Sequence, residues 1–167
     1  MDIFNVNIYI ETSTRGPALR EAAGEWIVEF ITSDGTPVTR SGIIRREKTT
    51  EYTLALELLR NALSILTKSC SVIVNTKCER ILNAAQNHWL AQWRKNGWVK
   101  ANGKPVANKE LWEQVSDLMG NHYVEFASGC HSYRNVMQED INRKLKEALE
   151  IVSIGKNTKG TGENNEN

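Results

Sequence analysis

Cysteine, proline and histidine are scarce in this chain of 167 residues, which has three of each. The cysteines, Cys70, Cys78 and Cys130, form no CxxC pair, and the histidines are scattered, so the sequence does not predict a zinc site. Three is an odd number, and disulfides are rare in reducing compartments. We therefore expect reduced thiols and a cytoplasmic location.

Long apolar runs are absent as well. No stretch approaches the roughly 18–20 apolar residues that cross a bilayer, so we expect no membrane partner. The opening stretch, MDIFNVNIYIE, lacks the basic and apolar regions of a signal peptide. A hydrophobic content of 40% and a charged content of 25% are ordinary for a globular protein. We expect one domain over residues 1–152, followed by a polar, disordered tail over 153–167.

Acidic residues are missing from the segment 80–109, although the formal net charge of the whole chain is only +1. The basic residues of this segment are Arg80, Arg94, Lys95, Lys100, Lys104 and Lys109. Four of the five tryptophans lie in the overlapping segment 89–112. We expect Trp89, Trp93 and Trp112 in the core, because aromatic residues at helical spacing usually pack inward. The concentrated charge favours binding of phosphates, although a solvated helix face would have the same composition.

The spacing of apolar residues predicts five strands and four helices in the order β-β-β-α-β-α-α-β-α. The strands are expected over 6–10, 26–31, 37–44, 71–75 and 123–127. The first helix is expected to begin at Thr50 or Thr53, the second covers 79–94, and the third covers 108–119. The last helix carries an apolar face between Met137 and Val152. This order predicts an α/β protein with a mixed five-stranded sheet and helices on both faces.

The segment 89–112 reads WLAQWRKNGWVKANGKPVANKELW, with tryptophans, basic residues and a Lys-Pro-Val segment at fixed spacings. Together with the element order, it resembles the basic protrusion, or handle, of type 1 ribonuclease H. The resemblance runs from about Val6 to Leu149. It implies a ribonuclease H-like fold and a handle that holds an RNA–DNA hybrid, mainly by the backbone of the DNA strand. The residues that it assigns to nucleic-acid binding are Arg94, Lys95, Trp98, Lys100 and Lys104.

The same resemblance implies hydrolysis of RNA–DNA hybrids with Mg²⁺ or Mn²⁺. In the family four carboxylates hold the ions, because hard cations prefer anionic oxygen ligands. At the first position, Glu11 replaces the usual aspartate in the motif I-Y-I-E-T-S. At the second, aligning the leucines gives Thr53, and a shift of one residue gives Tyr52. The third position, directly after the predicted buried strand, is Lys77.

The fourth carboxylate and the family's mobile histidine can each be aligned in two ways. The carboxylate position is Asp140 if Gly129 is aligned with the glycine of the family's K-G-H motif, and Asn142 if the apolar helix face is aligned. The histidine position is Cys130 by strict count and His131 after a shift of one residue. Asp140 and His131 are the candidates that match the family's residue types.

Lys77 and Thr53 leave two of the four positions without a carboxylate. A lysine ammonium repels Mg²⁺ and cannot coordinate it, so we expect two-metal catalysis to be lowered by several orders of magnitude. We hypothesise that Lys77 lies between Glu11 and Asp140 and replaces the charge of the metal, because two buried carboxylates would otherwise repel each other or take up a proton. In an active site, only Glu11 and Asp140 would remain as metal ligands.

Three functions are compatible with these residues. The first is a catalytically impaired ribonuclease H-like protein that needs no cofactor and binds a hybrid or another duplex. The second is an active Mg²⁺- or Mn²⁺-dependent hybrid endoribonuclease with a rearranged set of Glu11, Glu51 and Asp140. The third is a domain with a protein partner and a relic handle. In the first case, Thr49–Thr50 in place of an asparagine pair and Glu79 in place of a glutamine indicate that selectivity for hybrids is lost.

Overall fold

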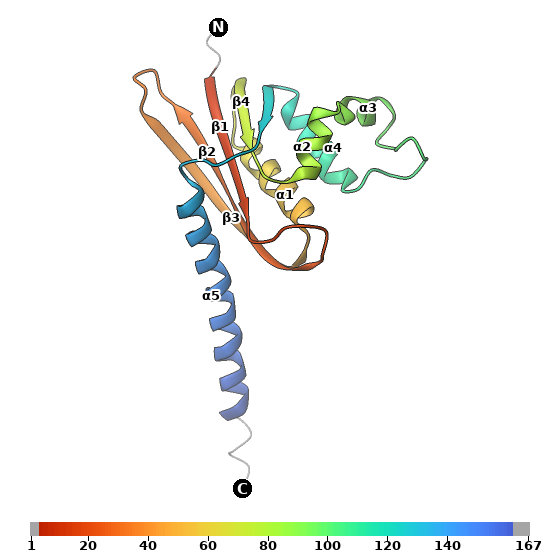
Figure 1. Cartoon of the computed structure of the whole chain (residues 1–167). Helices are drawn as coiled ribbons and strands as arrows, with labels where there is room; N and C mark the ends of the chain where they lie inside the picture. Colours follow the sequence, from red (N-terminus) through yellow and green to blue (C-terminus); the bar gives the residue numbers. More distant parts are fainter. Residues whose placement is uncertain (1–3, 162–167) are drawn as a thin grey trace.

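A five-stranded sheet forms the centre of the structure, a computed structural model that describes residues 4–161 (Figure 1). The strands are β1 (Phe4–Thr12), β2 (Arg20–Ile31), β3 (Pro37–Thr49), β4 (Cys70–Asn75) and β5 (Tyr123–Ala127). Their order is β3-β2-β1-β4-β5; β1 to β3 are antiparallel neighbours, and β4 runs parallel to both β1 and β5. The predicted mixed sheet is confirmed, with β2 and β3 longer than the sequence pattern indicated.

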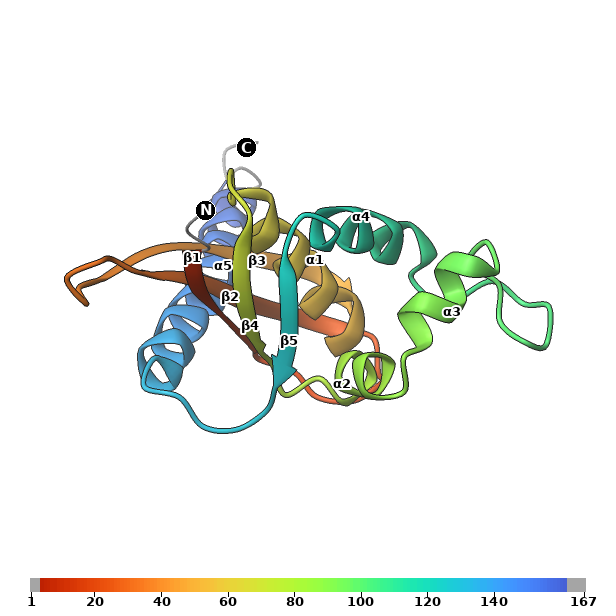
Figure 2. The same cartoon turned by 90° about the horizontal axis from the view of Figure 1, so that it is seen from above.

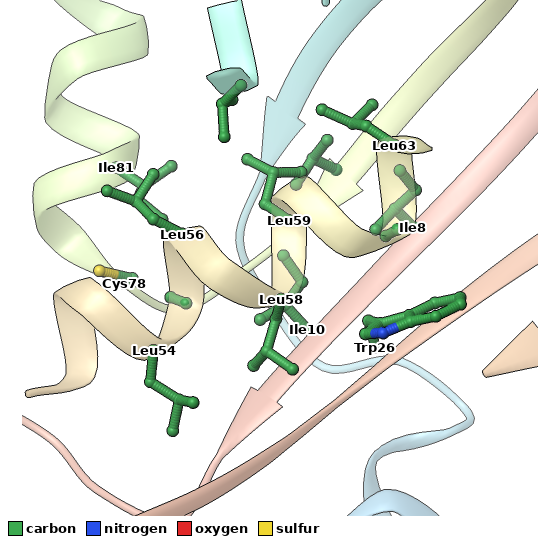
Figure 3. Close-up of a cluster of buried hydrophobic side chains, with 14 of the residues drawn as sticks. Ile8, Ile10, Trp26, Leu54, Leu56, Leu58, Leu59, Leu63, Cys78 and Ile81 are labelled. Carbon is green, nitrogen blue, oxygen red and sulfur yellow. The ribbon is translucent and has the colours of Figure 1, made fainter. Parts of the chain in front are cut away.

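Alternation along β1 determines which side chains meet the core. Val6, Ile8 and Ile10 are buried on the face that packs against α1 (Glu51–Ser64). The alternate residues Asn7, Tyr9 and Glu11 point to the opposite face. Figure 3 shows Ile8 and Ile10 beneath the leucines of α1. Eight of the 14 residues of helix α1 are buried, because the helix lies between the sheet and another helix, α4 (Lys109–Met119).

Helices cover both faces of the sheet, as predicted. Helix α1 lies on one face, and α5 (Arg134–Thr161) crosses the other face against β1, β2 and β3 before it projects beyond the sheet (Figures 1 and 2). The helix therefore continues into the region where a tail was expected from residue 153, and residues 162–167 lie outside the described part of the chain. None of the helices between residues 4 and 161 is long and apolar enough to cross a membrane.

The prediction of a single helix over 79–94 is wrong, because the structure contains two helices there. Helix α2 (Glu79–Gln86) ends before His88, which has a left-handed backbone with φ of 56°. Helix α3 (Trp89–Lys95) then starts in a new direction, since a left-handed residue cannot continue a right-handed helix. The described residues thus form five helices, one more than predicted.

Candidate functional site

Glu11 is the central residue of the candidate site and one of the most buried charged side chains, with only 2% of its surface exposed. It lies one residue before the end of β1, and Lys77 follows the end of β4 by two residues. Because these strands are parallel neighbours, their carboxyl ends meet at one edge of the sheet. This topology brings together two residues that are far apart in the sequence.

Both carboxylate oxygens of Glu11 are occupied by side chains of the protein. Lys77 Nζ lies 3.6 Å from Oε1, and His131 Nε2 lies 2.9 Å from the same oxygen. Gln138, in the second turn of α5, donates from Nε2 to Oε2 at 3.2 Å. The buried carboxylate is therefore compensated by an ammonium group and two hydrogen-bonding partners, as a buried charge requires.

Asp140 does not take the place that the sequence hypothesis gave it. It forms an ion pair with Arg143 at 3.4 Å, and within the described residues it makes no ion pair with Lys77. Its other neighbour is Glu25, which lies directly across from Glu11 on β2 and is 3% exposed. Burial raises the pKa of Glu25 to about 8, and the hydrogen bond to Asp140 and the charge of Asp140 contribute in the same direction.

Gln138 and Glu25 were not predicted as site residues. An amide such as Gln138 carries no charge and matches no metal-binding motif, so a search for carboxylates passes over it. Glu25 reaches the site only through the antiparallel register that pairs it with Glu11. The alternation of β2 could have placed Glu25 on the same face, but only after its pairing partner on β1 was known.

Thr53 and Glu51, at the start of α1, point to different surroundings. The hydroxyl of Thr53 donates to Oδ1 of Asn108 at 3.0 Å, which ties the helix to the start of α4. Glu51 accepts hydrogen bonds from Arg15 at 3.3 Å and from the backbone N–H of Gly16 at 3.2 Å. It lies in the first turn of α1 and also lines a small cavity together with Glu11.

The residues of this site do not fit a divalent metal ion. Magnesium requires about six oxygen ligands at close to octahedral geometry, usually including several waters. The cavity beside Glu11, Glu51 and Lys77 has a volume of about 10 Å³, which is room for about one water molecule. Over residues 4–161 no cluster of three or more Asp, Glu, His or Cys side chains could hold a metal. The Lys77 ammonium group lies next to Glu11, with Nζ 3.6 Å from Oε1.

The predicted handle projects from the body of the protein between α3 and α4 (Figure 2). Arg94 and Lys95 lie in the last turn of α3, and Lys100 and Lys104 lie in the following loop; all four side chains are exposed. The backbone N–H of Lys100 donates to the carbonyl of Lys104 at 2.8 Å, and Val99 and Pro105 form a β-bridge next to it. The loop is therefore held as a short hairpin that presents its cations at one end.

The tryptophans form the base of the handle, but they are not equally buried. Trp112 is fully buried, and its indole N–H donates to the hydroxyl of Tyr52. The ring centroids of Trp93 and Trp112 are 6.0 Å apart, and those of Trp89 and Trp93 are also 6.0 Å apart. The placement of Trp112 in the core is confirmed, Trp93 is partly buried, and Trp89 is 38% exposed, which contradicts its prediction as a core residue.

A cleft of about 540 Å³ lies beside these aromatic rings, between α2, α3 and the handle loop. Its walls include Trp89 and Trp93, and the cations Arg80 and Lys100. Aromatic faces next to cations provide stacking surfaces and phosphate contacts for nucleic acids. Trp98 lies partly buried behind the loop, with a left-handed backbone at φ of 63°.

Comparison with known sequences places the chain in one family. The sequence model of the RNase H family matches residues 5–149. Ribonuclease H of Clostridium botulinum (strain Hall) is 30% identical over 149 residues, which cover 89% of this chain and 98% of that protein. Ribonuclease H of Nitratidesulfovibrio vulgaris (strain DSM 19637) is 37% identical over 78 residues, or 47% of this chain and 50% of that protein.

Solved structures agree with the sequence matches. LC9-RNase H1, described as a type 1 RNase H with the type 2 active-site motif, superposes with a TM-score of 0.66 and 20% identity over 86% of this chain and 71% of that one. LC11-RNase H1 in complex with an RNA/DNA hybrid gives a TM-score of 0.56 and 18% identity over 86% of this chain and 99% of that one. The predicted ribonuclease H-like fold is confirmed, and the chain belongs to the ribonuclease H family.

Proposed function

We propose that this protein binds the phosphate backbone of nucleic acid through its handle and is impaired in metal-dependent hydrolysis. The observation that carries the proposal is the position of Lys77, whose Nζ lies 3.6 Å from Glu11 where the family has a carboxylate. With His131 and Gln138 on the same carboxylate, the site is closed by side chains of the protein.

The binding half of the proposal is supported by the exposed cations of the handle. None of Arg94, Lys95, Lys100 or Lys104 forms an ion pair within 4.0 Å among the described residues, so their charges are available to phosphates. Related folds support a duplex ligand. LC11-RNase H1 was solved with an RNA/DNA hybrid, and a foamy viral protease-reverse transcriptase was solved with double-stranded DNA.

The catalytic half is supported by the loss of ligands at two positions. Thr53 and Lys77 supply no carboxylate, and Asp140 interacts with Glu25 and Arg143. Members of the ribonuclease H family use divalent metal ions, which need several oxygen ligands converging on one point. We expect hydrolysis to be several orders of magnitude below that of an enzyme with four carboxylates.

One observation favours the alternative of a rearranged active site. Glu51 lines the same small cavity as Glu11, so two carboxylates are close to each other there. The third member of the rearranged set, Asp140, does not line this cavity and forms an ion pair with Arg143. A metal would also have to displace Lys77 from Glu11 and Arg15 from Glu51. We therefore prefer the impaired protein.

The deciding experiment measures both halves on one preparation. A labelled RNA–DNA hybrid is incubated with Mg²⁺ or Mn²⁺, and binding is followed over a range of salt concentrations. We expect no cleavage, together with binding that weakens steeply as salt rises, because phosphate contacts release counterions. The Lys77→Asp/Thr53→Glu double variant serves as a comparison that restores two acidic side chains.

Other outcomes select another function. Cleavage by the natural protein that is lost in Glu11→Ala but not in Glu125→Ala would establish a rearranged metal site, since Glu125 is exposed on the edge strand β5. If the natural protein shows no cleavage and no binding, the proposal is contradicted, and a role with a protein partner is favoured.

A further inference from the structure

A second cleft, with a volume of about 500 Å³, lies between the β1–β2 loop and the starts of α1 and α2. We call it the Lys77 cleft. Three cations line it, namely Arg15, Lys77 and Arg80, together with the acidic residues Glu51 and Glu79. Two helices begin at its wall, so the positive ends of both helix dipoles face the same space.

The cations of this cleft are the outer members of their ion pairs. The Lys77 side chain is 22% exposed, whereas its partner Glu11 is 2% exposed. The Arg15 side chain is 52% exposed, whereas its partner Glu51 is 13% exposed. A ligand that enters from solvent therefore meets ammonium and guanidinium groups before it meets these carboxylates. Of the acidic residues that line the cleft, Glu79 is the exposed one.

The Lys77 cleft adjoins the cleft that lies beside the tryptophans of the handle. Arg80 and Tyr52 line both this cleft and the cleft beside Trp89 and Trp93. The guanidinium carbon of Arg80 lies 4.2 Å from the centre of the Tyr52 ring, which fixes this cation at the junction. A nucleic-acid strand bound in the cleft beside Trp89 and Trp93 can thus continue past Arg80 to Lys77.

We propose that the Lys77 cleft binds a phosphate group of the nucleic-acid backbone directly, through Lys77, Arg15 and Arg80, without a divalent metal ion. A guanidinium group matches phosphate through two parallel hydrogen bonds, and an ammonium group binds it as a point charge. This inference rests on the proposed function and extends it: the edge of the sheet that binds metal in an active ribonuclease H here binds the ligand itself.

The test measures duplex binding against salt concentration in the presence of EDTA and again with Mg²⁺. The informative variant is Lys77→Gln/Glu11→Gln, which removes the outer cation and leaves no buried carboxylate without a partner. Each phosphate contact on duplex DNA contributes about −0.9 to the slope of log K against log salt. We expect the natural protein to bind duplex in EDTA without needing Mg²⁺, and the slope of the double variant in EDTA to be shallower by about one.

The matched control is Lys68→Gln. Lys68 is an exposed lysine before β4, at the end of the strand opposite to Lys77. The control lowers the net charge by one, whereas the double variant leaves the net charge unchanged. A change of slope in the double variant but not in the control therefore reports a local contact and not the overall charge. An unchanged slope in the double variant, or binding that requires Mg²⁺, would overturn the inference.

Inorganic phosphate distinguishes the source of the ligand group. It is added at constant ionic strength, and displacement of duplex and the change of melting temperature are measured. If it displaces duplex from the natural protein more than from the double variant, the cleft accepts any phosphate. If it does not, but the slopes differ, the cleft accepts phosphate only as part of the polymer; both results support the inference.

Failure of the proposed function can be distinguished from failure of this inference. If the natural protein binds no nucleic acid, the proposed function is wrong. The melting temperature then decides whether the cleft binds phosphate. If inorganic phosphate raises the melting temperature of the natural protein but not of the double variant, the Lys77 cleft binds phosphate. If it does not raise the melting temperature of the natural protein, the cleft has no phosphate site.

Discussion

The handle and the edge of the sheet at Glu11 use cations in opposite ways. In the handle, Lys100 and Lys104 are exposed at the end of a hairpin and have no acidic partner within 4.0 Å among the described residues. At the edge of the sheet, Lys77 lies over Glu11, a carboxylate that is almost completely buried. The first arrangement leaves charge free for a ligand. In the second, the cation also compensates a buried carboxylate and so stabilises the protein, and substitutions in the two regions should have different consequences.

The largest effect is expected for Lys77→Ala. The substitution leaves Glu11 with only the neutral partner Gln138 and His131, and removing one partner of a buried ion pair costs about 3–5 kcal/mol. We expect a loss of about 3 kcal/mol in the free energy of unfolding, measured with urea, because Lys77 is partly exposed. Lys68→Ala is the control. A loss below about 0.5 kcal/mol would mean that Lys77 is as weakly coupled as a surface cation.

A second effect on the free energy of unfolding should appear when pH is changed, and we expect it to depend on Glu25 of β2. The pKa of Glu25 is raised to about 8 in the folded protein, from an ordinary value near 4.5. The folded state therefore holds this proton more tightly, so the stability it contributes is fully present below pH 4.5 and is lost as pH rises to about 8. We expect the stability of the natural protein to fall over this range, and this fall to be absent in Glu25→Gln.

The pH experiment has a clear opposite result. Equal pH dependence in the natural protein and in Glu25→Gln would show that the carboxyl of Glu25 has the same pKa in the folded and unfolded chain. Glu21→Gln is a suitable control, because Glu21 is exposed on the same strand.

In the handle, the effect should be on binding and not on stability. We expect Lys100→Gln/Lys104→Gln to reduce the slope of log K against log salt by about two and to lower duplex affinity by about tenfold at moderate salt. The melting temperature should stay the same, because both side chains are exposed. Lys68→Gln/Lys146→Gln removes the same charge elsewhere. An equal loss of affinity in this control would place the binding surface outside the handle.

The smallest effect is expected at the contact that joins the two regions. Thr53→Val removes the hydroxyl that donates to Asn108 and leaves the amide oxygen without this partner. We expect a loss of about 1 kcal/mol in stability, measured by thermal unfolding, with Thr39→Val on the exposed edge strand as control. Equal melting temperatures for the two variants would show that the contact contributes nothing to the attachment of the handle.

Short-range patterns were sufficient to predict most of the fold. The alternation of Val6, Ile8 and Ile10 and the leucine spacing of α1 gave the correct element types and the sheet class. The break at His88 was missed, because a left-handed histidine leaves no distinct sequence signal. The motif spacing identified the family, since fixed distances between tryptophans and basic residues are rare by chance.

The site was less predictable, because its contacts depend on register between distant segments. Lys77 was placed near Glu11 correctly, since both follow recognisable parallel strands. The partner on α5 depends on where that helix crosses the sheet, and a shift of two residues separates Gln138 from Asp140. Such a shift changes the direction of a helical side chain by about 200°, and no motif in the sequence fixes it.

The aromatic contacts at the start of α1 separate two properties that could otherwise have been lost together. Tyr52 faces inward and is hydrogen-bonded to Trp112, while the next residue, Thr53, is the position that aligning the leucines matches to the family's acid. A substitution at position 53 therefore affects the hydrogen bond to Asn108 but leaves the contact between Tyr52 and Trp112 in place, because neighbouring residues on a helix point about 100° apart. In evolutionary terms, the residue at position 53 and the aromatic attachment of the handle can change independently. The same property gives protein engineers a position at which an acidic side chain can be introduced while the contact between Tyr52 and Trp112 is kept.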